Sequence, residues 1–126
     1  MNPKELKYSK GHTWAKIEGN KATIGVTEYA QHQLGSVLFV ELKQPGEAVT
    51  QFEPCGSVES DKATADIMSP LSGKVTEVNE EALNAPEVLN KDPYGEGWLL
   101  KLDLSNSAEV GNLMSAADFE AFTANA

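Results

Sequence analysis

Residues 57–68 read SVESDKATADIM, and two short runs of strand-like pattern flank the polar tetrapeptide ESDK within them. The second run, residues 63–67, alternates alanine or isoleucine with threonine and aspartate. A period of two is that of a β-strand, because successive side chains of a strand point to opposite faces. The segment therefore predicts a β-hairpin with Lys62 at or near its tip, joined by a polar turn that does not require positive φ angles.

Three further segments show the same period of two. In each, alternate residues are apolar: Ala22, Ile24 and Val26; Leu38, Val40 and Leu42; Trp98, Leu100, Leu102 and Leu104. We expect half-buried strands that turn these residues toward a core and the residues between them toward water. Turn signals such as Pro45-Gly46 and residues 92–95 (DPYG) separate the segments. Short strands punctuated in this way predict a β-sandwich or a flattened barrel.

The helices are expected to be short and to lie at the edges of the fold. Thr27 is a candidate N-cap for a two-turn helix, with Gly35 as its left-handed stop. Ser115 and Asp118 form a variant of the capping box within a C-terminal helical segment at about residues 106–124.

The composition indicates one globular domain over residues 1–126, with 40% hydrophobic and 23% charged residues. Its single cysteine, Cys55, excludes an internal disulfide and fits a reducing compartment. All ten basic residues are lysines, against 19 acidic residues, and the net charge of -9 disfavours nucleic acid as a partner. No apolar run approaches the roughly 20 residues of a membrane helix, so no membrane partner is expected. The N-terminus lacks the apolar core of a secretory signal, which predicts an intracellular protein.

Candidates for an active site are few. His12 and His32 do not stand in a metal-ligand spacing with Cys55, so no metal site is predicted. We interpret His32 as an exposed helix residue, His12 as a strand residue near an aromatic ring, and Cys55 as a buried free thiol. The glycines are scattered as turn residues and form no phosphate-binding loop. These observations favour a protein that is not an enzyme.

Lys62 has two interpretations. A hairpin lysine is usually a solvated turn residue, but a carrier needs its attachment lysine at such a tip, where a tether gives a high effective concentration at each active site. Residues 58–63 (VESDKA) and 69–75 (SPLSGKV) resemble a lipoyl-lysine attachment motif, in which the lysine takes lipoate through an amide bond. The pentapeptide ESDKA is also typical of lipoyl domains in 2-oxo acid dehydrogenase acyltransferases.

Outside this motif, the chain resembles the H protein of the glycine cleavage system from about Tyr8 to Phe122. The landmarks follow the family's order: HTW at 12–14, IGVT at 24–27, YAQ at 29–31, LG at 34–35, VEL at 40–42, VNE at 78–80, PEVLN at 86–90 and DPYGEGW at 92–98. The resemblance implies a mostly β, lipoyl/biotinyl-domain-like fold. This fold is a flattened barrel-sandwich hybrid of two antiparallel sheets with short peripheral helices, and its attachment hairpin covers about residues 57–68.

The resemblance also implies a function. Lipoate on Lys62 would accept the aminomethyl group of glycine from the P protein, a pyridoxal-phosphate glycine decarboxylase, and carry it to the T protein, an aminomethyltransferase. The L protein, a dihydrolipoyl dehydrogenase, would reoxidise the dithiol, and a lipoate ligase or lipoyltransferase would attach the cofactor. The chain itself would be a non-catalytic carrier in the cytoplasm, or in the mitochondrial matrix if it is a processed organellar chain.

Three further residues receive roles from the resemblance. Glu59 beside the tip and Gly73 in the facing turn, where it would allow the backbone conformation, are expected to be recognised by the attaching enzyme. Asp66 matches the family's acidic residue beyond the lysine and would contact the arm. In the family, a serine and a glutamate flank the histidine and help to line a cleft that shelters the loaded arm. Gly11 and Thr13 stand in their places here.

Two other functions are consistent with the sequence. The changes at Gly11 and Thr13 leave room for an H-like carrier that mainly donates lipoate or serves another lipoate-dependent pathway. A β-sandwich interaction protein with an unmodified Lys62 is the second alternative. Biotin is disfavoured, because biotinyl motifs favour Met-Lys-Met and residues 61–63 read DKA.

Overall fold

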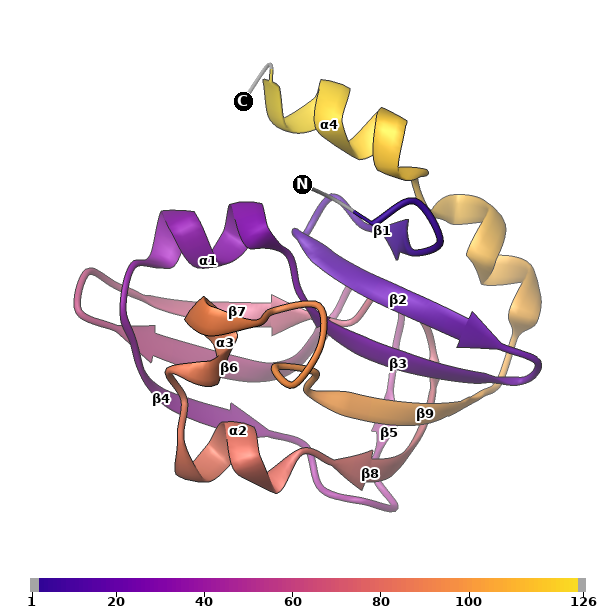
Figure 1. Cartoon of the computed structure of the whole chain (residues 1–126). Coiled ribbons are helices and arrows are strands. Elements are labelled where there is room, and N and C mark those ends of the chain that lie inside the picture. Colours follow the sequence, from indigo (N-terminus) through magenta and orange to yellow (C-terminus); the bar gives the residue numbers. More distant parts are fainter. Residues whose placement is uncertain (1–2, 125–126) are drawn as a thin grey trace.

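The structure is a computed structural model that describes residues 3–124 and shows two antiparallel β-sheets with short helices around them (Figure 1). This arrangement confirms the mostly β fold predicted from the period-two segments. The expected domain limits, residues 1–126, include residues 1–2 and 125–126, which lie outside the described part. The strands are β1 (Lys7–Tyr8), β2 (Thr13–Glu18), β3 (Lys21–Val26), β4 (Val37–Leu42), β5 (Ala48–Val49), β6 (Pro54–Ser60), β7 (Thr64–Met68), β8 (Gly73–Val78) and β9 (Leu100–Leu104).

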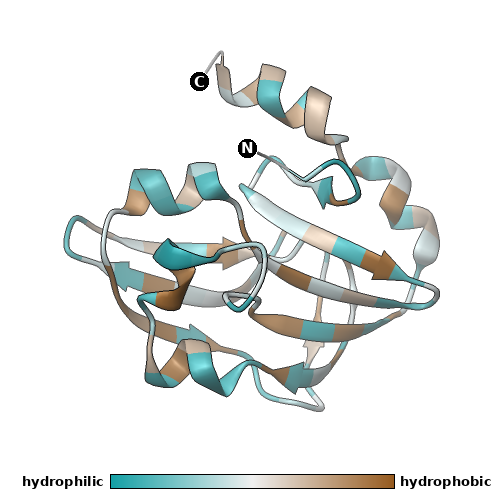
Figure 2. Ribbon diagram, in the orientation of Figure 1, coloured by the Kyte–Doolittle hydropathy of each residue, from teal (hydrophilic) through white to brown (hydrophobic). Residues whose placement is uncertain are grey.

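The two sheets differ in size and share one apolar core. The larger sheet has six strands in the order β1-β2-β3-β9-β8-β5, and the smaller has three in the order β4-β6-β7. Figure 2 shows the alternation on β9, where brown apolar and teal polar residues follow one another. Its apolar residues Leu100, Leu102 and Leu104 are buried, as expected. Leu99 just before the strand is buried as well, although the alternation placed it on the water side.

The helices are short, as the sequence predicts. They are α1 (Glu28–Leu34), α2 (Glu80–Asn84), α3 (Val88–Lys91), a 3-10 helix η1 (Ser107–Asn112) and α4 (Ala116–Ala124). The predicted N-cap is confirmed, because the Thr27 hydroxyl accepts a hydrogen bond from the Ala30 N–H at 3.1 Å. The Ser115 hydroxyl likewise accepts from the Asp118 N–H at 3.2 Å at the start of α4. The sequence pattern does not predict α2 and α3, each of which is only about one turn long.

A second, smaller apolar cluster attaches the C-terminal helix to the larger sheet. Tyr8 of β1 and Phe119 of α4 are both fully buried, and their rings stack with centroids 5.0 Å apart. Trp14 of β2 belongs to the same cluster and donates its ring N–H to the Pro93 carbonyl at 2.9 Å. The N-terminal strand and α4 therefore lie side by side, as Figure 1 shows.

One expectation about β4 is wrong. Leu38 was expected on the core side with Val40 and Leu42, but 58% of its surface is exposed. A register shift between Val37 and Phe39, where β4 pairs with β6, interrupts the alternation. Val37 therefore takes the buried place, and Leu38 and Phe39 both lie at the surface.

Candidate functional site

Lys62 is exposed in the turn between β6 and β7, at the tip of a hairpin whose strands pair from Glu59–Thr64 inward. Ser60 holds this turn. Its hydroxyl accepts hydrogen bonds from the Lys62 N–H at 3.2 Å and the Ala63 N–H at 3.1 Å, and its own N–H donates to the Ala63 carbonyl at 2.8 Å. Because Ser60 is itself buried, the backbone beneath the lysine has a fixed conformation.

The tip is also attached to the segment that follows α1. The Asp61 N–H donates to the Ser36 carbonyl at 3.1 Å, and the Ser36 N–H donates to Asp61 Oδ1 at 3.2 Å. Asn90 of α3 holds the same segment from the other side. Its Oδ1 accepts from the Val37 N–H at 2.9 Å, and its Nδ2 donates to the Gly35 carbonyl at 2.8 Å. The hairpin tip, the end of α1 and α3 thus form one hydrogen-bonded unit.

Gly35 lies directly against the stem of Lys62. A Cβ at Gly35 would lie 2.7 Å from Asp61 Oδ1 and 3.1 Å from Lys62 Cε. Its φ of 80° is positive, as expected for a helix stop, but its ψ of -152° is not the left-handed helical value that the sequence predicts. This conformation is essentially restricted to glycine, so the residue both ends α1 and leaves room for the lysine stem.

The other expected site residues do not gather at the tip. Glu59 is exposed on β6 beside the turn, and Asp66 is exposed further along β7. Gly73 is the buried first residue of β8 in the larger sheet, so the expectation that it shapes a turn is wrong. A Cβ at Gly73 would lie 2.2 Å from the Asp103 carbonyl oxygen, which means that close strand packing requires glycine there.

Gly11 and Thr13 both lie against Met68 in this chain. Thr13 is buried, and its hydroxyl donates to the Met68 carbonyl at 2.9 Å and shares a hydrogen bond with the Ser9 hydroxyl at 2.7 Å. A Cβ at Gly11 would lie 2.9 Å from Met68 Cβ. A serine at position 11 would therefore require Met68 to move, and a longer side chain at position 13 would have to break two hydrogen bonds.

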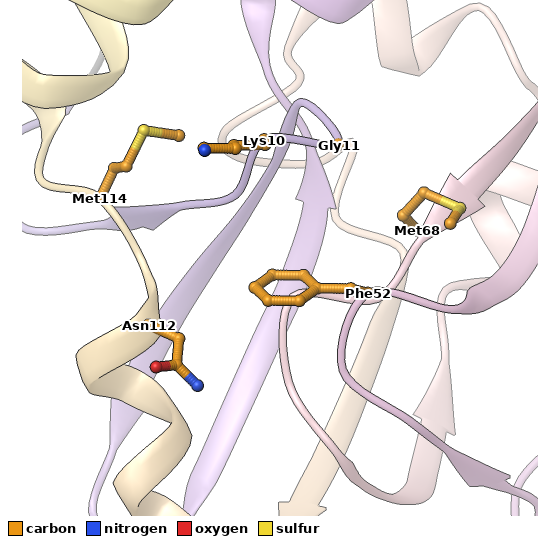
Figure 3. A pocket seen from close by; sticks show the side chains of 6 residues that line it. All are labelled: Lys10, Gly11, Phe52, Met68, Asn112 and Met114. Carbon is orange, nitrogen blue, oxygen red and sulfur yellow. The ribbon is translucent and has the colours of Figure 1, made fainter.

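Gly11 and Met68 border an apolar hollow of about 470 Å³. Figure 3 shows its lining, to which Phe52, Met68 and Met114 contribute apolar side chains and Lys10 and Asn112 polar ones. Asp66 lines a different, shallow hollow together with Lys43 and Glu41. The arm contact predicted for Asp66 remains a prediction, and the structure does not bring Asp66 into one pocket with Gly11.

The remaining candidates are not arranged for catalysis. Cys55 is completely buried, and burial raises the pKa of its thiol to about 12, so the reactive thiolate is scarce near neutral pH. His32 is exposed on α1, as expected. Within residues 3–124, no group of three or more His, Cys, Asp or Glu side chains could hold a metal ion. None of the helices in this range is long and apolar enough to cross a membrane.

His12 lies just before β2 rather than in a strand, and it packs among aromatic rings. Its ring centroid is 4.9 Å from that of Tyr29, 5.9 Å from Phe122 and 6.0 Å from Phe119. In the described part of the chain, its buried Nδ1 has no hydrogen-bond partner. Burial therefore lowers the pKa of His12 below its usual value near 6.5.

This burial predicts a loss of stability in mild acid. Between the lowered pKa of folded His12 and the usual value of about 6.5, the unfolded chain binds the proton more readily. The free energy of unfolding should therefore fall as the pH decreases from about 7.5 to 5.5. Asparagine tolerates the positive φ of 66° at this position, so His12→Asn should weaken that dependence. Urea denaturation of both proteins across this range measures it, and parallel pH profiles would contradict it. His32→Asn, at an exposed position, is the control.

Comparisons with known proteins agree with this arrangement. A model of the "Glycine cleavage H-protein" family matches residues 6–126. The glycine cleavage system H protein of Symbiobacterium thermophilum is 54% identical over 96% of this chain and 94% of its own length. Glycine cleavage system H protein 2, mitochondrial, of Arabidopsis thaliana is 50% identical over 94% of this chain and 76% of its own length. The crystal structure of an H protein from Mycobacterium marinum superposes with a TM-score of 0.90 at 34% identity, over 98% of this chain and 99% of that chain.

Proposed function

Because this chain belongs to the glycine cleavage H-protein family, and is thus a lipoyl carrier of the glycine cleavage system, we propose that Lys62 is its attachment residue. The observation that carries this proposal is the geometry of the tip. Lys62 is exposed, its turn is held by Ser60, and Asp61 is attached to Ser36 on the body of the protein. A tether that starts from such a fixed point sweeps a defined volume around the protein.

The residues at the tip fit a lipoyl group attached through an amide. In its unprotonated form the Lys62 amine attacks an activated carboxyl carbon, the activating group leaves with its bonding electrons, and the amine loses a proton. The lysine charge disappears in this step, so the length and direction of the side chain matter afterwards. Gly35 supports that direction, because it leaves room for the stem.

The proposed partners follow from the family. When bound, the lipoyl group supplies a disulfide that can accept a one-carbon amine unit and be reduced to a dithiol. We expect the P, T and L proteins to act on that group in turn, and a lipoate ligase or lipoyltransferase to attach it. The chain contributes attachment and positioning rather than catalysis. We expect it in the compartment of these partners, the cytoplasm or the mitochondrial matrix; one relative is named mitochondrial.

One experiment tests this function directly. The purified protein is lipoylated, mixed with P protein and glycine, and assayed for exchange of labelled bicarbonate into the glycine carboxyl group. We expect exchange with the lipoylated protein and none above background with the unlipoylated protein. A lipoylated protein that supports no exchange would instead favour a role in another lipoate-dependent pathway.

A further inference from the structure

The smaller sheet has an outer face on which side chains lie in two rows across the strands. Phe39, Glu59 and Thr64 are paired in register across β4, β6 and β7, and so are Glu41, Ser57 and Asp66. Residues paired in this way point to the same side of a sheet. The residues between them, such as Val40 and Val58, face the core. The first row is nearer the Lys62 turn, because Glu59 and Thr64 are the last pair of β6 and β7 before that turn.

This face carries exposed apolar surface beside the lysine. Among the described residues, the exposed large hydrophobic side chains are Leu38, Phe39 and Phe52, and the first two are consecutive residues of β4. The register shift between β4 and β6 places them there, with 58% and 53% of their surfaces exposed. Burying a large side chain on the core side would stabilise the fold, so exposing two next to each other suits a surface that another molecule covers.

The same face is acidic. Glu41, Glu59 and Asp66 are exposed on it, and Asp61 is exposed at the tip. The ion pairs that the structure shows within residues 3–124, Lys21–Asp103 and Lys101–Glu77, involve other residues. Lys43 is the one lysine that lines the shallow hollow on this face with Glu41 and Asp66. A partner surface that matches it would therefore be basic around an apolar pocket.

We propose that Leu38 and Phe39, together with the acidic side chains around them, form the docking surface for the enzyme that attaches the lipoyl group. These acidic residues are Glu41, Glu59, Asp61 and Asp66. This proposal rests on the proposed function of Lys62. The attaching enzyme must take the Lys62 amine itself into its active site, so it has to cover the surface around the turn. Enzymes that act on the far end of a loaded arm need not do so. The partner would insert an apolar pocket over Phe39 and surround it with lysine or arginine side chains.

The apolar part is tested by measuring the kinetics of lipoylation of the unmodified protein with a purified lipoate ligase. Phe39→Ser and Leu38→Ser remove exposed side chains, so folding should be preserved. If Phe39 is a central contact, Phe39→Ser should raise the KM for the carrier by about tenfold, with little change in kcat. Phe52→Ser is the matched control, because it removes a similarly exposed phenylalanine that is not on these strands.

The charged part is tested by Glu41→Lys in the same assay. The KM should rise, and its increase with salt concentration should become less steep, because one attractive charge has become repulsive. Glu18→Lys is the control, since Glu18 lies at the β2–β3 turn, at the other end of the molecule from the Lys62 turn (Figure 1).

The outcomes separate this inference from the function on which it rests. A parent protein that takes up no lipoate would contradict the role of Lys62. A parent that is lipoylated, together with Phe39→Ser and Glu41→Lys variants whose KM values equal the parent's, would overturn the docking surface alone. Unchanged KM values for lipoylation would overturn the docking surface even if Phe39→Ser and Glu41→Lys were poorer substrates for the P protein.

Discussion

Lys62→Arg is expected to give a folded protein that takes up no lipoate and supports no bicarbonate exchange with glycine. Arginine keeps the positive charge and a stem of similar length at an exposed position, so the turn held by Ser60 should be unaffected. Its guanidinium stays protonated at any working pH and cannot act as the nucleophile that the lysine amine provides. Intact mass spectrometry after incubation with ligase, ATP and lipoate should therefore show the unmodified mass.

Two other lysines provide the controls for this substitution. Lys74 of β8 lies in the second stretch of the motif, residues 69–75, but is on the larger sheet, and Lys43 follows β4. Lys74→Arg and Lys43→Arg should be lipoylated to the same mass as the parent. Peptide mapping that finds lipoate on Lys74 or Lys43, or an added lipoyl mass on Lys62→Arg, would contradict the assignment.

The period of two predicted the strands because burial of one face fixes a strand's register. It succeeded on β3 and β9, where Ile24, Leu100 and Leu102 are buried as expected. It failed at Leu38, because a register shift depends on how β4 pairs with β6, two segments that are separated in the sequence. The helices α2 and α3 were missed since four or five residues are too few to show a helical period.

At the proposed attachment site, the sequence points to the lysine but not to the groups that hold the turn around it. The motif around Lys62 is local, so the sequence alone identified the lysine as the residue to examine. The groups that hold the tip come from elsewhere: Ser36 and Gly35 follow α1, and Asn90 belongs to α3. Asn90 lies within the landmark PEVLN, but nothing in that string indicates a hydrogen bond to residues 35 and 37. Such contacts require the folded backbone.

Gly73 has a different structural role from the one that the motif led us to expect. The motif places a glycine after the hairpin, and we expected it to shape a turn that the attaching enzyme recognises. It is instead a strand residue against which the backbone of β9 packs closely, at Leu104 and Asp103. A substitution there acts first on the sheet, so a loss of lipoylation alone could not be attributed to recognition.

Gly73→Ala is therefore expected to destabilise the protein strongly. The added methyl group would lie 2.2 Å from the Asp103 carbonyl oxygen, and this neighbour is backbone in a paired strand that cannot turn aside. We expect a loss of about 3 kcal/mol in the free energy of unfolding, at the upper end for overpacking in a core. Urea denaturation measures it, and Gly111→Ala is the matched control, because a Cβ at Gly111 meets nothing within 4 Å.

The same variant decides between packing and recognition at this position. If packing alone requires glycine, the Gly73→Ala protein that remains folded at low temperature should be lipoylated with the parent's KM, because Lys62 and its turn lie on the other sheet. Recognition by the attaching enzyme would give the reverse pattern: a raised KM with an unchanged free energy of unfolding. An alanine at position 73 with parental stability would also mean that β8 and β9 can separate without cost at their first paired residues, Gly73–Leu104 and Lys74–Asp103, although the register shift in this pair of strands lies further on, between Val75 and Glu77.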